Sequence, residues 1–255
     1  MAQVTAPSSW PLARRINKAA LSRLSRLRHR RVVTLPTDRA ILALSFDDVP
    51  MSAAIEGARI LDRFGVRATY YVCGGIDPAE PGAPFADAAT LQSLSRDGFE
   101  IGCHSFRHID FQDHDLRALT TDLDRNARWF AENGLPEPRS FAYPYGRTRP
   151  LAKALCAGRF ALCRGVKPAW VRGAFDAALA PSLPLFADAG SVALLDQAMR
   201  SIAEGGGAVF AFTHAVTDTP GLYDCTADQL AATMTRAHEL GIEVMRMDDV
   251  VGAAD

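Results

Sequence analysis

Two adjacent carboxylates, Asp47 and Asp48, follow a short apolar run in this 255-residue chain. Five of the six residues in 41–46 are apolar, which is typical of a buried strand. Two ionised acids at the end of such a strand repel each other and lose their hydration, so we expect positive charge beside them. A divalent metal ion is the simplest source of that charge.

A pair of histidines supplies matching ligands. His104 and His108 follow a second apolar run, residues 99–103, and residues four apart lie on one side of a helical turn. Helices carry such pairs by chance, but here a strand ending in two acids accompanies the pair. Two histidines and one aspartate suit Zn²⁺ first, with Co²⁺, Ni²⁺ or Mn²⁺ as alternatives. The other aspartate would accept a proton from a water activated by the ion.

Two further segments end in residues that could take part in hydrolysis. The apolar run 208–213 leads into His214. A histidine there is commonly a core residue, but opposite a metal site it is a candidate general acid. Residues 139–143 lead into the stiff turn Pro144-Tyr145-Gly146. This is either a plain turn or a groove wall whose Tyr145 N–H faces an oxyanion.

Strands and helices alternate along the chain after residue 38, which indicates parallel strands joined by helical crossovers. Seven strands are predicted, and they fit a closed or nearly closed barrel better than an open sheet. In such barrels, chemistry takes place at the carboxyl ends of the strands, so the candidate residues should meet at one face. The predicted strands are 41–46, 68–73, 99–103, 140–143, 160–163, 208–213 and 242–245. The predicted helices between them are 53–64, 86–96, 115–133, 150–156, 192–203 and 226–240.

These segments resemble the motifs of the polysaccharide deacetylase family, the NodB-homology carbohydrate esterases. The resemblance covers about residues 38–250 and implies an α/β fold, a distorted (β/α)7-type barrel that agrees with the strand count. The matching motifs are Ser45-Phe46-Asp47-Asp48, His104 to His108, Pro144-Tyr145-Gly146 and Thr213-His214.

The resemblance implies a role for each matching residue. Asp47 would be the catalytic base and His214 the acid. Tyr145 would supply an oxyanion-hole N–H and, with Pro144, part of the groove. The implied metal ligands are Asp48, His104 and His108.

The chain departs from the family pattern at two places. Many members carry an arginine two residues before the motif's proline, where it holds the catalytic aspartate, and this chain has Ala142 there. The sequence offers Arg139, Arg164 or Arg172 as substitutes. The fourth motif, an aspartate that tunes the catalytic histidine, is indistinct, and Asp176 is the nearest candidate.

The expected function is therefore metal-dependent removal of N-acetyl groups from a glycan or an N-acetylated sugar. The form of the Pro-Tyr-Gly motif is similar to members associated with bacterial exopolysaccharide and surface-glycan pathways, an argument by analogy within the family. One alternative is a hydrolase of cyclic amides or ureides. Another is a glycan-binding barrel that holds metal without turnover, which the missing arginine would favour.

The N-terminal residues differ in charge from the rest, which suggests a basic extension, 1–37, before a barrel domain, 38–255. The spacing of apolar residues predicts an amphipathic helix over 11–30. This helix would either pack on the domain or lie on an anionic membrane surface. Nucleic acid is not expected, because no recognition motif accompanies the charge. Eight basic residues precede Asp38, the first acid; the remainder has 20 basic and 29 acidic residues. The predicted apolar face is Leu12, Ile16, Ala20, Leu24 and Leu27.

The sequence contains no signal-peptide pattern and no 18-residue apolar run, which predicts a cytoplasmic location, with peripheral contact at the inner membrane face as an option. The five cysteines are then expected to be reduced thiols. A cytoplasmic enzyme would meet sugar nucleotides, small amides or lipid-linked glycan intermediates. The sequence leaves the oligomeric state open.

Overall fold

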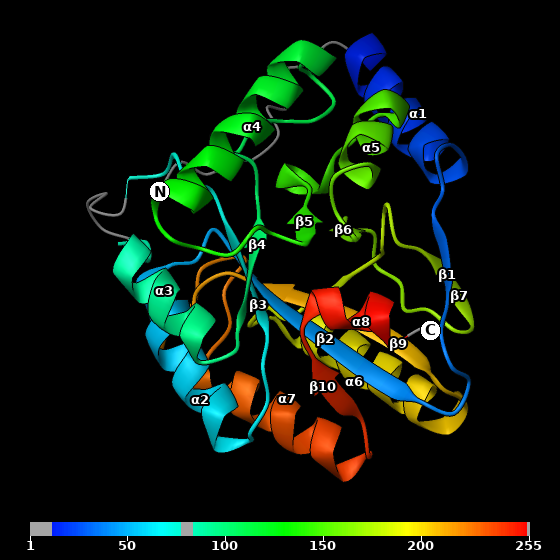
Figure 1. Ribbon diagram of the computed structural model, residues 1–255. Coiled ribbons are helices and arrows are strands. Elements are labelled where there is room, and N and C mark those ends of the chain that lie inside the picture. Colours follow the sequence, from blue (N-terminus) through cyan, green and yellow to red (C-terminus); the bar gives the residue numbers. More distant parts are fainter. Residues whose placement is uncertain (1–11, 78–83, 254–255) are drawn as a thin grey trace.

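The structure is a computed structural model that describes residues 12–77 and 84–253. Its parallel strands form one curled sheet, with helices packed along the outside (Figure 1). Seven strands follow one another in the order β6-β5-β4-β3-β2-β9-β8, and β10 pairs separately with β2. This arrangement confirms the predicted distorted barrel. The strands are β2 Ala40–Asp47, β3 Thr69–Val72, β4 Glu100–Cys103, β5 Ser140–Ala142, β6 Leu162–Arg164, β8 Leu183–Pro184, β9 Gly207–Thr213 and β10 Glu243–Met245.

The barrel is distorted where β6 and β8 meet. Strands β6 and β8 are not paired with each other in the described sheet; an isolated bridge between Arg164 and Ala180, just before β8, links the two sides. Each of the seven predicted strands is present. Strand β8 was not predicted, because two residues make no periodic pattern.

The helices lie close to their predicted positions. Asp87, Asp115, Asp188 and Thr226 each accept a hydrogen bond from a backbone N–H in the first turn of the helix that follows, which explains where four helices begin. Helix α8 was not predicted, since it is short and starts with two acids. The elements are η1 Ala53–Gly57, a π-helical turn, and α2 Ala58–Arg63, α3 Ala88–Arg96, α4 Leu116–Glu132, α5 Pro150–Ala157, α6 Ala189–Gly205, α7 Ala227–Glu239 and α8 Met247–Gly252.

Strand β2 is the centre of the sheet. It pairs with β9 along seven residues on one edge, and shares the other edge between β10 and β3. Seven of its eight residues are buried, since the strand is covered on both faces. Asp47 is the last residue of this strand, which places a carboxylate at the buried carboxyl end of the sheet.

The N-terminal segment contacts the barrel. Helix α1 (Leu12–Leu27) lies beside α5, and strand β1 (Val32–Thr34) pairs antiparallel with β7 (Ala174–Asp176). Residues 1–11 of the predicted extension lie outside the described part of the chain. Among the helices that the structure describes, none combines the length and apolarity needed to cross a bilayer.

Candidate metal centre

The three predicted ligands meet at the carboxyl ends of β2 and β4. Asp48 Oδ1 lies 3.8 Å from His104 Nε2 and 3.8 Å from His108 Nε2, and the three ligand atoms lie within 4.8 Å of one another. Two ligands at Zn–N distances of about 2.1 Å in a tetrahedron are about 3.4 Å apart. The three side chains therefore fit a common cation and leave positions open for water and substrate.

His104 is oriented as a metal-binding histidine. Its Nδ1 donates a hydrogen bond to the Ala142 carbonyl oxygen at 2.7 Å, which leaves Nε2 free to face Asp48. Burial lowers the pKa of His104 to about 4, so the ring is neutral at physiological pH. A neutral imidazole has the lone pair that a metal ion requires.

The backbone at the site adopts conformations that side chains normally avoid. Six non-glycine residues in the described chain have positive φ, and five of them lie in or beside the three motifs. Val49 is the least expected, because β-branched residues rarely occupy this region. Such conformations cost free energy and persist where the surrounding structure enforces them, as at functional sites. The five are Asp48 (φ 60°), Val49 (52°), Ser105 (68°), His108 (52°) and Tyr145 (59°).

Asp47 is held by a buried arginine from another strand. Arg164, at the end of β6, donates from Nη2 to both oxygens of Asp47 at 2.6 and 2.5 Å. Burial raises the pKa of Asp47, but the charges of Arg164, His104 and His214 outweigh burial and leave this pKa below its ordinary value of 3.8. Asp47 is therefore ionised at neutral pH and is turned toward Arg164 beside the ligand triad.

The position of Arg164 explains how Asp47 has an arginine partner although residue 142 is an alanine. Ala142 on β5 and Arg164 on β6 are direct partners in the sheet. The guanidinium thus comes from the neighbouring strand at the same level of the barrel. Its Cζ lies 4.7 Å from the centre of the Phe212 ring and 5.4 Å from that of Tyr71, which enclose it.

The structure does not bring the other proposed orienting residues to the site, so those predictions were wrong. Arg139 precedes β5 at the amino end of the barrel, where its Nε lies 3.9 Å from Asp248. Arg172 donates to the Ser201 carbonyl on α6. Asp176 accepts from the buried Lys153 at 2.5 Å and from the Arg31 N–H at 2.9 Å.

His214 follows β9, whose Thr213 is the sheet partner of Phe46. Because the strands are parallel, His214 comes level with Asp47. Its Nδ1 lies 3.3 Å from the Tyr223 carbonyl oxygen, and its ring packs against the Tyr223 ring at 5.6 Å. A backbone carbonyl therefore takes the orienting position that the sequence assigned to Asp176.

Tyr145 closes another side of the site. Its ring meets the His108 ring edge-on, with centres 4.5 Å apart. Pro144 is buried at the start of the tight turn Pro144–Gly146. The Tyr145 ring thus lies against His108, one of the three candidate ligands.

Two polar residues of α4 support the site, and sequence reasoning missed them. Asp122 Oδ1 accepts a hydrogen bond from the Phe106 N–H at 2.7 Å, within the turn between the two ligand histidines. Asn126 Oδ1 accepts from the Gly74 N–H at 2.9 Å, just after β3. Both lie on the buried face of α4 with Leu119 and Leu123. Polar residues on an otherwise apolar helix stripe are the signal that could have found them.

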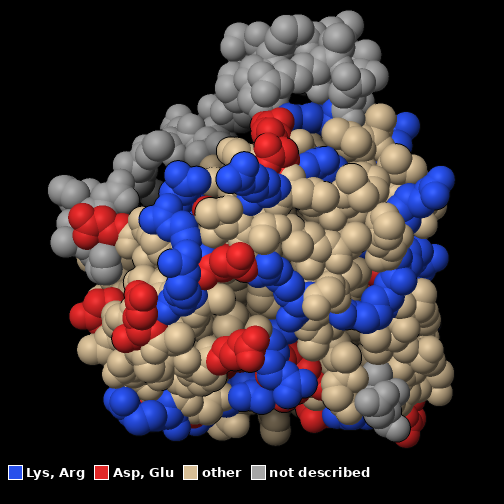
Figure 2. Space-filling model, turned by 45° about the horizontal axis from the view of Figure 1, so that its top comes forward, with Lys and Arg blue, Asp and Glu red and all other residues tan. Residues whose placement is uncertain are grey.

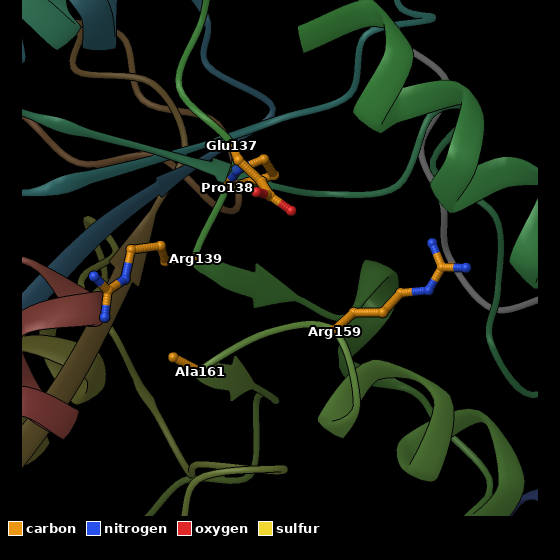
Figure 3. Close-up of a pocket in the computed structure, with 5 residues that line it drawn as sticks. All are labelled: Glu137, Pro138, Arg139, Arg159 and Ala161. Carbon is orange, nitrogen blue, oxygen red and sulfur yellow. The ribbon is translucent and has the colours of Figure 1, made fainter. Parts of the chain in front are cut away.

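A separate hollow of about 400 Å³ lies at the opposite end of the barrel (Figure 3). Arg139 and Ala161, which line it, immediately precede β5 and β6. Figure 3 shows the Arg139 and Arg159 side chains pointing in different directions. The hollow contains none of the ligand residues and is distinct from the metal centre.

Comparisons with known proteins agree with this geometry. The family model described as polysaccharide deacetylase matches residues 34–157. A bifunctional xylanase/deacetylase from Pseudobutyrivibrio xylanivorans is 24% identical over 108 residues, which are 42% of this chain and 17% of that protein. A chitin deacetylase from Pestalotiopsis sp. is 24% identical over 127 residues, which are 50% of this chain and 41% of that protein. The matched regions thus span less than half the length of these two relatives.

A solved structure shares the fold. A pseudoenzyme of carbohydrate esterase family 4 from Bacillus anthracis superposes with a TM-score of 0.62 at 16% identity, covering 86% of this chain and 67% of that one. The family match covers just under half of the chain, so the motifs, this match and the shared barrel make the chain similar to the polysaccharide deacetylases. The family match ends before Arg164 and His214, so it does not bear on these two residues.

Proposed function

We propose that the protein is a metal-dependent hydrolase that removes N-acetyl groups from a glycan or an N-acetylated sugar. One observation carries the proposal: the Asp48, His104 and His108 ligand atoms converge beside an ionised Asp47 that a buried arginine holds. A structural metal site would not need this second, non-ligating carboxylate.

Asp48, His104 and His108 would hold one divalent ion, with Zn²⁺ first and Co²⁺, Ni²⁺ or Mn²⁺ as alternatives. Such an ion polarises an amide carbonyl and lowers the pKa of water. The neutral ring of His104 and its hydrogen bond to Ala142 prepare one ligand before the ion arrives.

Asp47 would accept the proton of the water that attacks the acetamide carbonyl. Arg164 keeps this carboxylate ionised and fixes its direction, so little reorganisation is needed during the reaction. His214, level with Asp47 across the β2–β9 pair, would protonate the departing amine. The Tyr145 N–H would donate to the developing oxyanion. The products would be acetate and a free amino sugar.

The similarity to polysaccharide deacetylases supports an N-acetylated glycan as the substrate class. The proposed role is in bacterial surface-glycan or exopolysaccharide synthesis, with lipid-linked intermediates as one form of the substrate. A location in the cytoplasm belongs to the same proposal. Nucleic acid is not among the proposed partners.

The test combines metal analysis of the purified protein with an acetate-release screen over N-acetylated glycans and their carrier-linked forms. We expect one divalent ion per chain and release of acetate. Asp47→Asn should keep the ion and lose at least about a hundredfold in rate, since a general base contributes that much. Asp38→Asn, at an exposed carboxylate away from the site, is the matched control.

Full acetate release by Asp47→Asn with metal bound would contradict the proposed role of Asp47 as the general base. A ring-opened product without acetate would instead indicate a cyclic amide hydrolase. Glycan binding without any product would indicate a non-catalytic barrel.

A further inference from the structure

Helix α1 attaches to the barrel through its polar side. Lys18 Nζ lies 2.6 Å from Asp113 and 3.1 Å from Asp110, both in the loop after His108. Ser25, which is buried, donates to the Thr148 carbonyl oxygen at 3.3 Å. At 100° per residue, positions 18 and 25 share one side of the helix. The apolar side must therefore face elsewhere.

The opposite side of α1 is exposed and partly apolar. Leu27 is 74% exposed and Leu24 is 41% exposed, and Ala20 beside them is exposed as well. Val32, shortly after the helix, is 56% exposed. Ala20, Leu24 and Leu27 of the predicted apolar face thus point away from the barrel. Packing of this face on the domain was one of the two arrangements expected from the sequence. Leu12 and Ile16 precede the residues whose side chains are described.

Exposed arginines surround these apolar side chains. Arg23 and Arg26 lie on α1, and Arg28 and Arg30 follow its end; all four are exposed. The chain has no acidic residue before Asp38. In Figure 2, the right-hand side of the molecule, over α1 and β1, carries blue and tan with little red until the lower edge. We call Ala20, Arg23, Leu24, Arg26 and Leu27 the α1 outer face.

The α1 outer face is held in place by buried contacts of its carboxyl end. Lys153, fully buried on α5, donates to the carbonyl oxygens of Ser25 at 2.7 Å and Arg28 at 2.9 Å. The Arg31 guanidinium donates to the Ala157 and Phe160 carbonyl oxygens. The face is therefore displayed by a fixed helix, and substitutions on it should leave the fold intact.

We propose that the α1 outer face binds an anionic lipid surface, with the helix parallel to the membrane plane. Exposed leucines flanked by arginines, on a helix whose other side is occupied, match an interfacial helix. Arginines near an anionic bilayer each contribute to binding, and leucines enter the boundary between headgroups and acyl chains. The combination favours lipid over nucleic acid, which would gain nothing from exposed leucines. The proposal requires no catalytic activity, so it stands or falls separately from the proposed function.

The experiment is co-sedimentation of the full chain with vesicles of phosphatidylcholine alone or mixed with phosphatidylglycerol. We expect binding to the mixed vesicles only, weakening as salt is added, because exposed charges are screened. Arg23→Gln with Arg26→Gln should weaken binding by about fivefold for each arginine removed. Leu24→Gln with Leu27→Gln should weaken it by about tenfold or more, because the apolar insertion is lost.

Matched control variants show whether an effect is specific to the α1 outer face or follows from losing any exposed arginine or apolar side chain. Val192→Gln on α6 removes an apolar side chain with the same 41% exposure as Leu24. Arg63→Gln with Arg96→Gln removes two exposed arginines from α2 and α3. Circular dichroism and thermal unfolding should be unchanged in all variants. Equal losses in controls and outer-face variants, no preference for anionic vesicles, or an unaffected leucine double variant would each overturn the proposal. Binding to RNA that survives the leucine substitutions would also count against it.

Discussion

Each end of the barrel holds two neighbouring carboxyl groups, and at least one of each pair is buried, but the pKa of the buried acid shifts in opposite directions at the two ends. At the carboxyl end, Asp47 and Asp48 lie beside Arg164 and two histidines, and the pKa of Asp47 is lowered. At the amino end, Glu100 at the start of β4 meets Asp248 of α8. There the pKa of both acids is raised, that of Glu100 to about 7.

The neighbours of each pair explain the difference. Arg164 is buried and donates two hydrogen bonds to Asp47, so its charge is barely screened. Burial raises the pKa of Glu100, and the nearby charge of Asp248 raises it further. Glu100 Oε2 accepts from two neutral donors, the Thr69 hydroxyl at 2.6 Å and the Asp248 N–H at 3.1 Å. A buried acid thus has a lowered pKa where a buried cation faces it, as Asp47 does, and a raised pKa where the nearby arginines, Arg139 and Arg246, are exposed or half-buried.

The largest expected effect comes from removing the cation at the carboxyl end. Arg164→Met should lower the free energy of unfolding by about 3–5 kcal/mol, because it leaves the buried Asp47 without its counter-ion. Acetate release should disappear. Adding Asp47→Asn should recover most of the stability but none of the activity. Chemical denaturation of the single and double variants measures the coupling, and additive losses would contradict the pairing.

A relocation variant sharpens the same comparison. Ala142 and Arg164 are partners in the sheet, so Ala142→Arg combined with Arg164→Ala moves the guanidinium to the position that many family members use. We expect part of the activity and stability lost in Arg164→Ala to return. No recovery would mean that the direction of approach to Asp47, and not only the charge, is required.

The next effect is the pH dependence of stability, which should have opposite signs at the two ends. The pKa of Glu100 rises from its ordinary value of 4.5 to about 7 on folding, so the folded state binds the proton more tightly. Stability from this group is fully present below about pH 4.5 and is lost as the pH rises to about 7. The pKa of Asp47 is lowered, so its contribution is present above pH 3.8 and is lost as the pH falls below that value.

Glu100→Gln tests the amino end. The amide cannot ionise, so the decline in stability between pH 4.5 and 7 should flatten, by an amount on the order of a few kcal/mol. Denaturation midpoints measured across that range in both proteins give the difference. Glu243→Gln, at an exposed acid on β10, should leave the slope unchanged. A variant whose slope matches the wild-type protein would show that Glu100 is ionised throughout.

The sequence predicted the strands and the candidate ligands at the carboxyl end of the barrel, but it did not predict the acid pair at the amino end. The seven strands were found because strands covered on both faces read as apolar runs, and β2 is the clearest case. Asp48, His104 and His108 were found because each follows such a run. Glu100 and Asp248 carry no comparable signal, since the chain separates them widely and each alone resembles a surface acid.

Arg164 marks the limit of sequence reasoning at the site itself. The sequence showed that an arginine was missing at Ala142 and offered three substitutes, but choosing among them needs the pairing of β5 with β6. Register between strands depends on which side chains fill the barrel interior, and local patterns do not encode it. The hydrogen-bond partner of His214 was also beyond the sequence. It is the backbone carbonyl of Tyr223, and a carbonyl leaves no mark in the sequence.

The smallest effect we expect concerns the support of the metal ligands. Asp122→Ala removes the acceptor for the Phe106 N–H, which loosens the turn between His104 and His108. Losing such a supporting group lowers metal affinity by about 10- to 100-fold, and we expect the lower figure because the ligands themselves remain. Asp122→Asn keeps one acceptor oxygen and should lose less. Asp124→Ala, at an exposed acid on the same helix, is the control.

Competition with a chelator measures the metal affinity of each variant. Glu100→Gln should bind the ion like the wild-type protein, because the amino end of the barrel has no part in metal binding. Equal affinity in Asp122→Ala and Asp124→Ala would show that the backbone conformation of the turn holds His104 and His108 without help from α4.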